Sequence, residues 1–161
     1  MLPFDPKFVS AIGKPLFITG RGIDISMPRG TPIVAVGKAK IIYSGPQAPS
    51  SCKSGEKVPG GCETKMILLK LVNPILIKKM LYNLIWYESL EKLVFKKSLT
   101  SPRIIKVKAG ELLATSGAGL GVPHLNFRLL TENDGSIGAA MTETQLSSYI
   151  WAQIATTKSA G

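Results

Sequence analysis

Alternating apolar and polar residues recur along the chain and predict short β-strands, because successive side chains of a strand point to opposite faces of a sheet. Residues 81–95 also fit a helical pattern, but their aromatic and β-branched content favours a strand. Asn73 precedes Pro74, which disfavours helix there and predicts a connection containing a turn over 73–79. The other predicted strands lie at 18–26, in a β-hairpin over 33–45 that turns at Gly37 and Lys38, at 65–72, on either side of a tight turn at Lys108–Gly110 within 103–117, and at 123–130.

A different pattern follows the turn predicted by Asn-Asp-Gly at 133–135. Leu146, Ile150 and Ile154 share one face of a helix, and Thr142 with Gln145 forms a capping-box pattern before them. We therefore expect a helix over 141–157 that packs on the sheet. The pattern as a whole predicts a mainly β fold, with an antiparallel sheet and a short C-terminal helix.

Length and composition fit one globular domain over residues 1–161. The chain has 161 residues, of which 45% are hydrophobic, and contains no internal repeat or low-complexity linker. Its 16 glycines and 11 prolines are typical of a protein with many turns between short strands. No stretch is uninterrupted and apolar enough for a transmembrane span, and no signal peptide is visible at the start.

The formal net charge of +10 is unevenly distributed, since residues 65–108 contain ten Lys or Arg and two acidic residues. This basic stretch, Lys65–Lys108, is either a solvated surface or a surface that attracts an anionic polymer. Aromatic residues are not interleaved with the lysines, and no helix-turn-helix or zinc-finger spacing occurs, so nucleic acid is an unlikely partner.

Two cysteines, Cys52 and Cys62, bracket a stretch rich in Gly, Pro, Ser and Lys that is predicted to be a loop. A local disulfide between them would indicate an oxidising compartment, whereas two free thiols would suit a cytosolic or virion protein. With a single distant histidine, they make a poor zinc site.

That histidine, the only one in the chain, lies in the segment GVPHLNF. On a strand, His124 and Asn126 point to one side, and Leu125 and Phe127 point to the other. Such a strand can present a pair of polar site residues above an apolar core.

Three segments, in order, resemble the lysostaphin-type (LytM-like) zinc endopeptidase domain over residues 11–130. GRGIDISMPRGTPIVAVGKAKIIYSG (20–45) is similar to its His-x-Gly-x-Asp run and Gly-Thr-Pro turn, and LIWYESLEKL (84–93) to its Tyr-x-His-Leu segment. IIKVKAGELLATSGAGLGVPHLNFRLL (104–130) is similar to its glycine-rich loop and Pro-His-Leu-His-Phe strand. The resemblance implies the duplicated hybrid motif-like β fold and an ancestry among zinc enzymes that cleave peptidoglycan peptides.

The family's zinc site is incomplete in this sequence. Gly20 replaces the first zinc-ligating histidine, Asp24 keeps the ligating carboxylate, and Asn126 replaces the last zinc-ligating histidine. The resemblance aligns Ser89, or Glu88 with a shift of one residue, with the middle catalytic histidine, and His124 with the other catalytic histidine. We expect Asn126 to hydrogen-bond His124 or a backbone group.

One carboxylate and one amide cannot replace a full zinc ligand set, whose binding contributes about 10–16 kcal/mol in structural sites. We therefore predict that the chain holds no zinc or other cofactor. The predicted function is that of a catalytically inactive endopeptidase-like module with a binding, scaffold or regulatory role. Its partners would be peptidoglycan or a protein in a larger assembly, located in the cell envelope, the periplasm, the extracellular space or a virion.

Three other functions stay open. An atypical zinc metalloendopeptidase would retain activity with the residues that remain. A biotinyl- or lipoyl-type carrier domain would share the Val-Lys-x-Gly-Glu turn near Lys108, but lacks the usual Met-Lys-Met. A Ser89–His124–Asp24 triad would require His124 to lie between the other two side chains and an oxyanion hole beside them.

Overall fold

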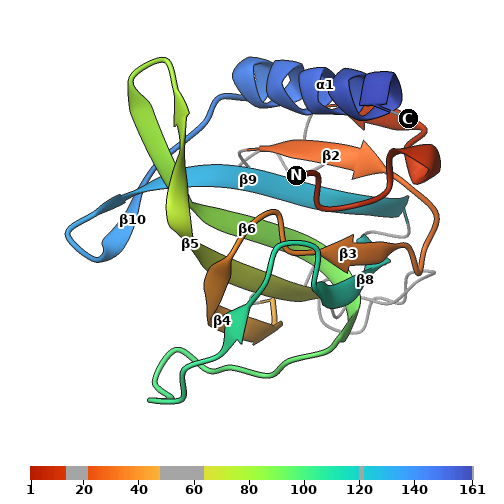
Figure 1. Cartoon of the computed structure of the whole chain (residues 1–161). Coiled ribbons are helices and arrows are strands. Elements are labelled where there is room, and N and C mark those ends of the chain that lie inside the picture. Colours follow the sequence, from red (N-terminus) through yellow and green to blue (C-terminus); the bar gives the residue numbers. More distant parts are fainter. Residues whose placement is uncertain (14–21, 48–63, 120–121, 161) are drawn as a thin grey trace.

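The computed structural model describes residues 1–13, 22–47, 64–119 and 122–160. Within these ranges the chain forms ten strands, one short 3₁₀ helix and one α-helix (Figure 1). In chain order they are η1 (Pro6–Phe8), β1 (Ala11–Gly13), β2 (Ile23–Ser26), β3 (Pro32–Val34), β4 (Ala39–Pro46), β5 (Lys65–Ile77), β6 (Met80–Leu93), β7 (Lys106–Val107), β8 (Leu112–Gly119), β9 (Val122–Asn133), β10 (Ser136–Ala140) and α1 (Glu143–Ala160).

The described strands form one sheet in the order β1-β2-β9-β8-β6-β5-β4-β7, and the pairings between them are antiparallel. β3 joins the sheet through β8, β10 joins through β9, and β9 also pairs with β6. The expected mainly β, antiparallel fold with a C-terminal helix is therefore confirmed. The strand predicted over 81–95 is also confirmed, as β6.

One face of the sheet carries the main hydrophobic core. Ile23 and Ile25 of β2, together with Leu125 and Phe127 of β9, are almost completely buried there. Phe127 meets Tyr87 of β6 edge to face, with ring centroids 5.4 Å apart. Because side chains alternate along each strand, the residues between these apolar ones point to the opposite face.

Helix α1 covers the core at the β2 side of the sheet (Figure 1). Leu146, Ile150 and Ile154 are buried in the core cluster, as their helical spacing predicted. At the start of the helix, the hydroxyl of Thr142 accepts a hydrogen bond from the backbone N–H of Gln145 at 3.3 Å, which confirms the predicted cap.

The hairpin predicted over 33–45 is wrong. β3 pairs with β8, where Ile33 lies opposite Ala114, and β4 pairs with β5, where Ile41 lies opposite Leu69. Each predicted arm is a strand, but its partner comes from a distant part of the chain. Alternation identifies which face of a strand is buried and does not identify its neighbour.

The connection predicted over 73–79 does contain a turn, but only at its end, because β5 continues to Ile77. The turn consists of Lys78 and Lys79, which adopt φ values of 48° and 67°. Pro74 lies in an irregularity of the β5–β6 register between Lys70 and Ile75, where a residue without an N–H is tolerated.

Strand β10 was not predicted, although the turn before it was. Asp134 and Gly135 both have positive φ, at 48° and 82°, as in the two-residue turn of a β-hairpin. β10 consists mostly of small residues, Ser136–Ala140, and therefore lacks the apolar alternation that marks the other strands.

Candidate functional site

Polar side chains gather on the face of the sheet opposite the main core, where β2, β9 and β6 lie side by side. In the strand register, Asn126 of β9 lies opposite Asp24 of β2 on one side and Glu88 of β6 on the other. His124 lies opposite Ser26 on β2 and Gly117 on β8. Asp24, Glu88, Ser89, His124 and Asn126 are all buried, with relative exposures of 1–7%.

The Asn126 amide bridges two charged side chains. Its Nδ2 donates a hydrogen bond to Oδ1 of Asp24 at 2.8 Å, and its Oδ1 accepts one from Nε of Arg128 at 3.2 Å. The expected partners, His124 or a backbone group, were wrong. Arg128 competes for the amide because it stands two residues after Asn126 on the same strand face.

Arg128 links Asn126 to the next strand. Its Nη2 lies 3.5 Å from Oε2 of Glu88, and its guanidinium carbon lies 5.0 Å from the centre of the Trp86 ring. The indole Nε1–H of Trp86 donates to the other Glu88 oxygen at 2.6 Å. One buried network therefore runs from Asp24 through Asn126 and Arg128 to Glu88, with one cation between two carboxylates.

His124 has a defined tautomer in this arrangement. Its Nδ1 lies 2.6 Å from the backbone oxygen of Val122, and because a carbonyl can only accept, Nδ1 carries the proton. The hydroxyl of Ser89 lies 3.0 Å from Nε2 and donates to it when the ring is neutral. The structure therefore brings Ser89 and His124 together.

Ser89 reaches His124 because its backbone is left-handed, with φ at 64°. In a regular strand, Ser89 and Glu88 would point to opposite faces. The positive φ and the register shift that follows it, between Leu90 and Lys92, turn both side chains to the polar face. The structure thus brings in both Ser89 and Glu88, which the sequence offered as alternatives.

The three side chains do not have the geometry of a Ser-His-Asp triad. Oδ2 of Asp24 lies 3.9 Å from Nε2 of His124, which is the same nitrogen that accepts the Ser89 proton. A triad requires the carboxylate at the other ring nitrogen, and Val122 takes that position here.

The donor set also does not suit a zinc ion. Oδ1 of Asp24 is engaged by the Asn126 amide, whose oxygen faces the cationic Arg128. If the Asn126 amide were rotated by half a turn, its oxygen would face the Asp24 carboxylate and its NH₂ group would face the Arg128 N–H. Both contacts would be repulsive. Within the described ranges, no three His, Cys, Asp or Glu side chains are grouped to hold a metal ion.

Some predicted residues cannot be placed. Gly20, Cys52 and Cys62 lie outside the described residues, so the first zinc position and the disulfide stay predictions. Conversely, Arg128 and Trp86 belong to the network but were not among the predicted site residues. Arg128 could have been found, because alternation along 123–130 places it on the same face as His124 and Asn126.

A solvent-exposed ion pair joins the strand segment after Ser89 to the turn before β3. Nε of Arg29 donates to Oε1 of Glu91 at 2.8 Å, and this hydrogen bond lowers the pKa of Glu91. Because both side chains are partly exposed, the pair contributes little to stability.

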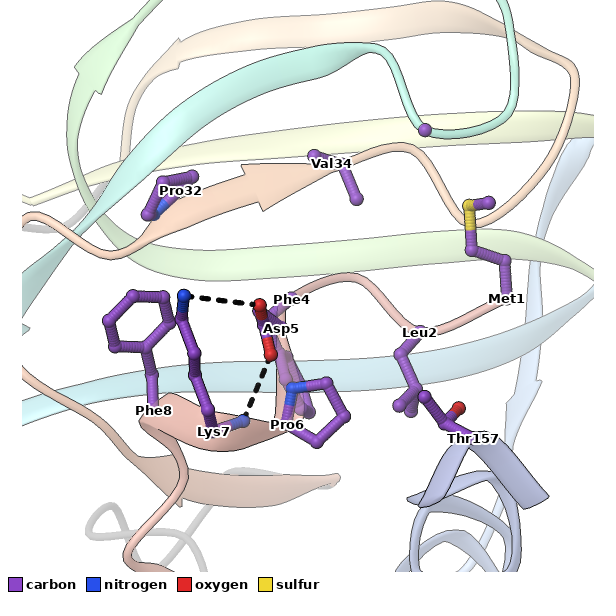
Figure 2. Close-up of a pocket in the computed structure, with 11 residues that line it drawn as sticks. Met1, Leu2, Phe4, Asp5, Pro6, Lys7, Phe8, Pro32, Val34 and Thr157 are labelled. Carbon is purple, nitrogen blue, oxygen red and sulfur yellow. Dashed lines mark hydrogen bonds and ion pairs between the residues drawn. The ribbon is translucent and has the colours of Figure 1, made fainter. Parts of the chain in front are cut away.

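A separate, mainly apolar hollow of about 840 Å³ lies at the N-terminal segment (Figure 2). Leu2, Phe4 and Phe8 line it with Val34 of β3 and Thr157 of α1. None of the polar network residues borders it, so it is no part of the candidate site.

Among the solved structures that are similar in fold are two peptidase catalytic domains. The catalytic domain of the antimicrobial peptidase lysostaphin from Staphylococcus simulans is 24% identical with a TM-score of 0.50, over 81% of this chain and 83% of that one. The catalytic domain of the prophage-encoded M23 protein EnpA from Enterococcus faecalis is 21% identical with a TM-score of 0.51, over 88% of this chain and 93% of that one. This chain has the lysostaphin-type fold. No protein-family model and no curated protein matches it by sequence.

The resemblance stated from the sequence is thus confirmed at the level of the fold. The described part of the chain also contains no helix long and apolar enough to cross a membrane.

Proposed function

We propose that this chain is an endopeptidase-like module of lysostaphin type that has lost the zinc chemistry and acts by binding. It would recognise peptidoglycan, or a protein of the cell envelope or a virion, and serve as a scaffold or regulatory domain. The observation that carries the proposal is the Asn126 amide, which bridges Asp24 and Arg128 at the position where the resemblance implies a zinc-ligating histidine.

The electrostatics of the network support this proposal. The Arg128 guanidinium already offsets part of the negative charge of Asp24 and Glu88, so a zinc ion near Asp24 would be attracted less strongly than by two carboxylates with no neighbouring cation. Asn126 and Arg128 supply polar partners within the protein instead. Asp24 and His124 remain from the ancestral set, and they favour the competing function, an atypical metalloendopeptidase.

Metal content and cleavage separate the two functions. We expect the purified protein, after incubation with zinc and dialysis, to retain far less than one zinc per chain and to release no new amino groups from peptidoglycan. A Gly20→His/Asn126→His variant restores both histidines that the resemblance implies beside Asp24, and we expect it to bind zinc stoichiometrically. One zinc per chain in the unmodified protein, with chelator-sensitive cleavage, would overturn the proposal.

Co-sedimentation with insoluble peptidoglycan tests the binding role. We expect the protein to sediment with it in the presence of a chelator. Trp86 lies on the polar face and is part-buried, so Trp86→Ala should weaken the interaction. Trp151 is half exposed on α1, and Trp151→Ala is the matched control that should not. Equal losses from both variants would contradict a binding surface on the polar face.

A further inference from the structure

A second hollow, of about 620 Å³, lies at the far end of β4, between the start of β5 and the segment that follows β6. Four cationic side chains line it, and no acidic residue is among its described lining residues. The cations are Lys65, Lys96, Lys97 and Arg103. Such a concave, single-sign surface concentrates anions.

The wall of this hollow is held in place by hydrogen bonds. Ser44 and Lys97 exchange two backbone hydrogen bonds of 2.9 and 3.0 Å, and the Ser44 hydroxyl donates to the Phe95 oxygen at 2.7 Å. Nζ of Lys97 donates to the backbone oxygens of Ser98 and Ser101 at 2.8 and 2.6 Å. The hollow is thus formed before any ligand arrives, which reduces the entropy cost of binding.

Lys96 and Arg103 are exposed, and neither makes an ion pair with another described residue. Their charged groups are available to a ligand, in contrast to Lys97, which holds the wall. The Ser98 and Ser101 hydroxyls stand beside them. Ammonium, guanidinium and hydroxyl groups together suit the oxygens of a phosphate.

The lining does not suit nucleic-acid bases. Its one aromatic residue is Tyr43, whose hydroxyl donates to the Pro46 oxygen at 2.5 Å and whose ring packs on a small apolar cluster with Leu68. Single-strand binders offer several open rings on which bases stack. A phosphate carried by a sugar or a polyol therefore fits this lining better than a nucleotide.

A further lysine-lined hollow, of about 450 Å³, lies at the start of β4 and is bordered by Lys38, Lys40 and Lys106. Lys40 and Pro46 are six positions apart on β4, which corresponds to about 20 Å along a strand. A polymer with repeated phosphates can contact both hollows, whereas a single phosphate contacts one. Linking the two contacts raises the affinity without any new group.

We propose that the hollow lined by Lys65, Lys96, Lys97 and Arg103 binds the phosphate groups of a sugar- or polyol-phosphate polymer. The proposal specifies the chemical class of the anionic polymer that the basic stretch, Lys65–Lys108, could attract. It does not rest on the loss of zinc, because the hollow contains none of the residues of the polar network.

Titration with poly(glycerol phosphate) in the presence of EDTA tests this site. We expect saturable binding that weakens with added salt, as contacts to phosphate do. Lys96→Gln/Arg103→Gln should raise the Kd at least about tenfold, because charge-assisted hydrogen bonds each contribute about a factor of ten. Inorganic phosphate should compete only at much higher concentration.

The control is Lys78→Gln/Lys79→Gln, which removes the same charge at the opposite end of β5 and should change the Kd less than about threefold. Equal effects of the two double variants would mean that binding depends only on the net charge of the protein, and would overturn the proposal. A single-stranded DNA of equal charge that binds as tightly as the polymer would overturn it as well. Since EDTA is present throughout, neither result bears on the zinc measurement above.

Discussion

The Asn126 side chain has one donor group and one acceptor group, and neighbours of opposite charge engage one each. The amide nitrogen donates a hydrogen bond to Asp24 at 2.8 Å, and the amide oxygen accepts one from Arg128 at 3.2 Å. Histidine at this position would not hold the same pair, because only one of its ring nitrogens is bonded to Cγ, the other lies one bond farther from the backbone, and the two point in different directions from the amide atoms. In the local sequence Asn-Phe-Arg, Asn126 and Arg128 therefore hydrogen-bond each other, and Asn126 also binds Asp24, without the need for a metal ion.

Ser89 combines an unfavourable backbone conformation with a favourable side-chain contact. We expect Ser89→Ala to lower the free energy of unfolding by about 1–3 kcal/mol, because it leaves the buried Nε2 of His124 without its donor. Ser89→Gly loses the same hydrogen bond but relieves the left-handed backbone, a gain of about 1 kcal/mol. In urea denaturation, the glycine variant should thus be the more stable of the two.

An alanine variant as stable as the glycine variant would contradict strain at Ser89. Strain of this kind is typical of functional sites, and here it turns the side chain toward His124. The sequence could not reveal it, since period-two alternation assigns Ser89 to the same side as Tyr87, which points into the core. By contrast, Asp24, His124, Asn126 and Arg128 follow the alternation, and their common face was available from the sequence alone.

At the scale of elements, β8 must approach the β6 bulge closely, and Gly117 permits this. A Cβ atom on Gly117 would lie 2.9 Å from the Ser89 oxygen and 3.3 Å from the backbone of Leu90 and Glu91. We expect Gly117→Ala to lower the free energy of unfolding by about 1–3 kcal/mol, because a backbone neighbour cannot move aside. Thermal or urea unfolding measures this change.

Gly13→Ala is the matched control, since a Cβ atom there meets nothing within 4 Å. It should change stability by less than about 0.5 kcal/mol. If both variants lose the same stability, the cost lies in strand propensity and not in the approach of β8 to β6.

Helix α1 holds its place through one apolar face. Ile150 is almost fully buried, and we expect Ile150→Ala to cost about 2–5 kcal/mol of stability through lost contacts and the cavity left behind. The neighbouring Trp151 is half exposed, so Trp151→Ala should cost far less despite removing a larger side chain. The reverse order in denaturant unfolding would mean that α1 packs through its other face.

The elements also show which parts of a fold a pattern can predict. The helical face of Leu146, Ile150 and Ile154 and the strand at 81–95 follow from periodicity, and both are confirmed. The partners of β3 and β4 do not, because their hydrogen bonds go to β8 and β5, which are far along the chain. β10 has too few large apolar residues to produce a signal at all.

At the scale of the whole molecule, two groups of charged side chains among the described residues differ in burial. The network on β2, β9 and β6 is largely buried and internally paired, whereas Lys38, Lys40, Lys96 and Arg103 at the two basic hollows are exposed. The network therefore contributes to the integrity of the sheet, and the basic surface contributes net charge that can attract a partner. A zinc ion bound at the network would be part of the folded state, and its binding free energy would add to the stability of the domain.

Thermal unfolding with and without metal tests whether the whole domain gains stability from bound zinc. A zinc ion present at 100 times its Kd would stabilise the folded state by about 2.7 kcal/mol. In a domain of this size, each kcal/mol shifts the Tm by about 2–4 °C, so a true site would raise the Tm by about 5–10 °C. We expect added zinc and added EDTA to leave the Tm of the unmodified protein within about 1 °C of its starting value.

The Gly20→His/Asn126→His variant should instead gain stability with zinc and lose it with EDTA. A zinc-dependent rise in the unmodified protein would mean that residues beyond Asp24 and Asn126 complete a metal site.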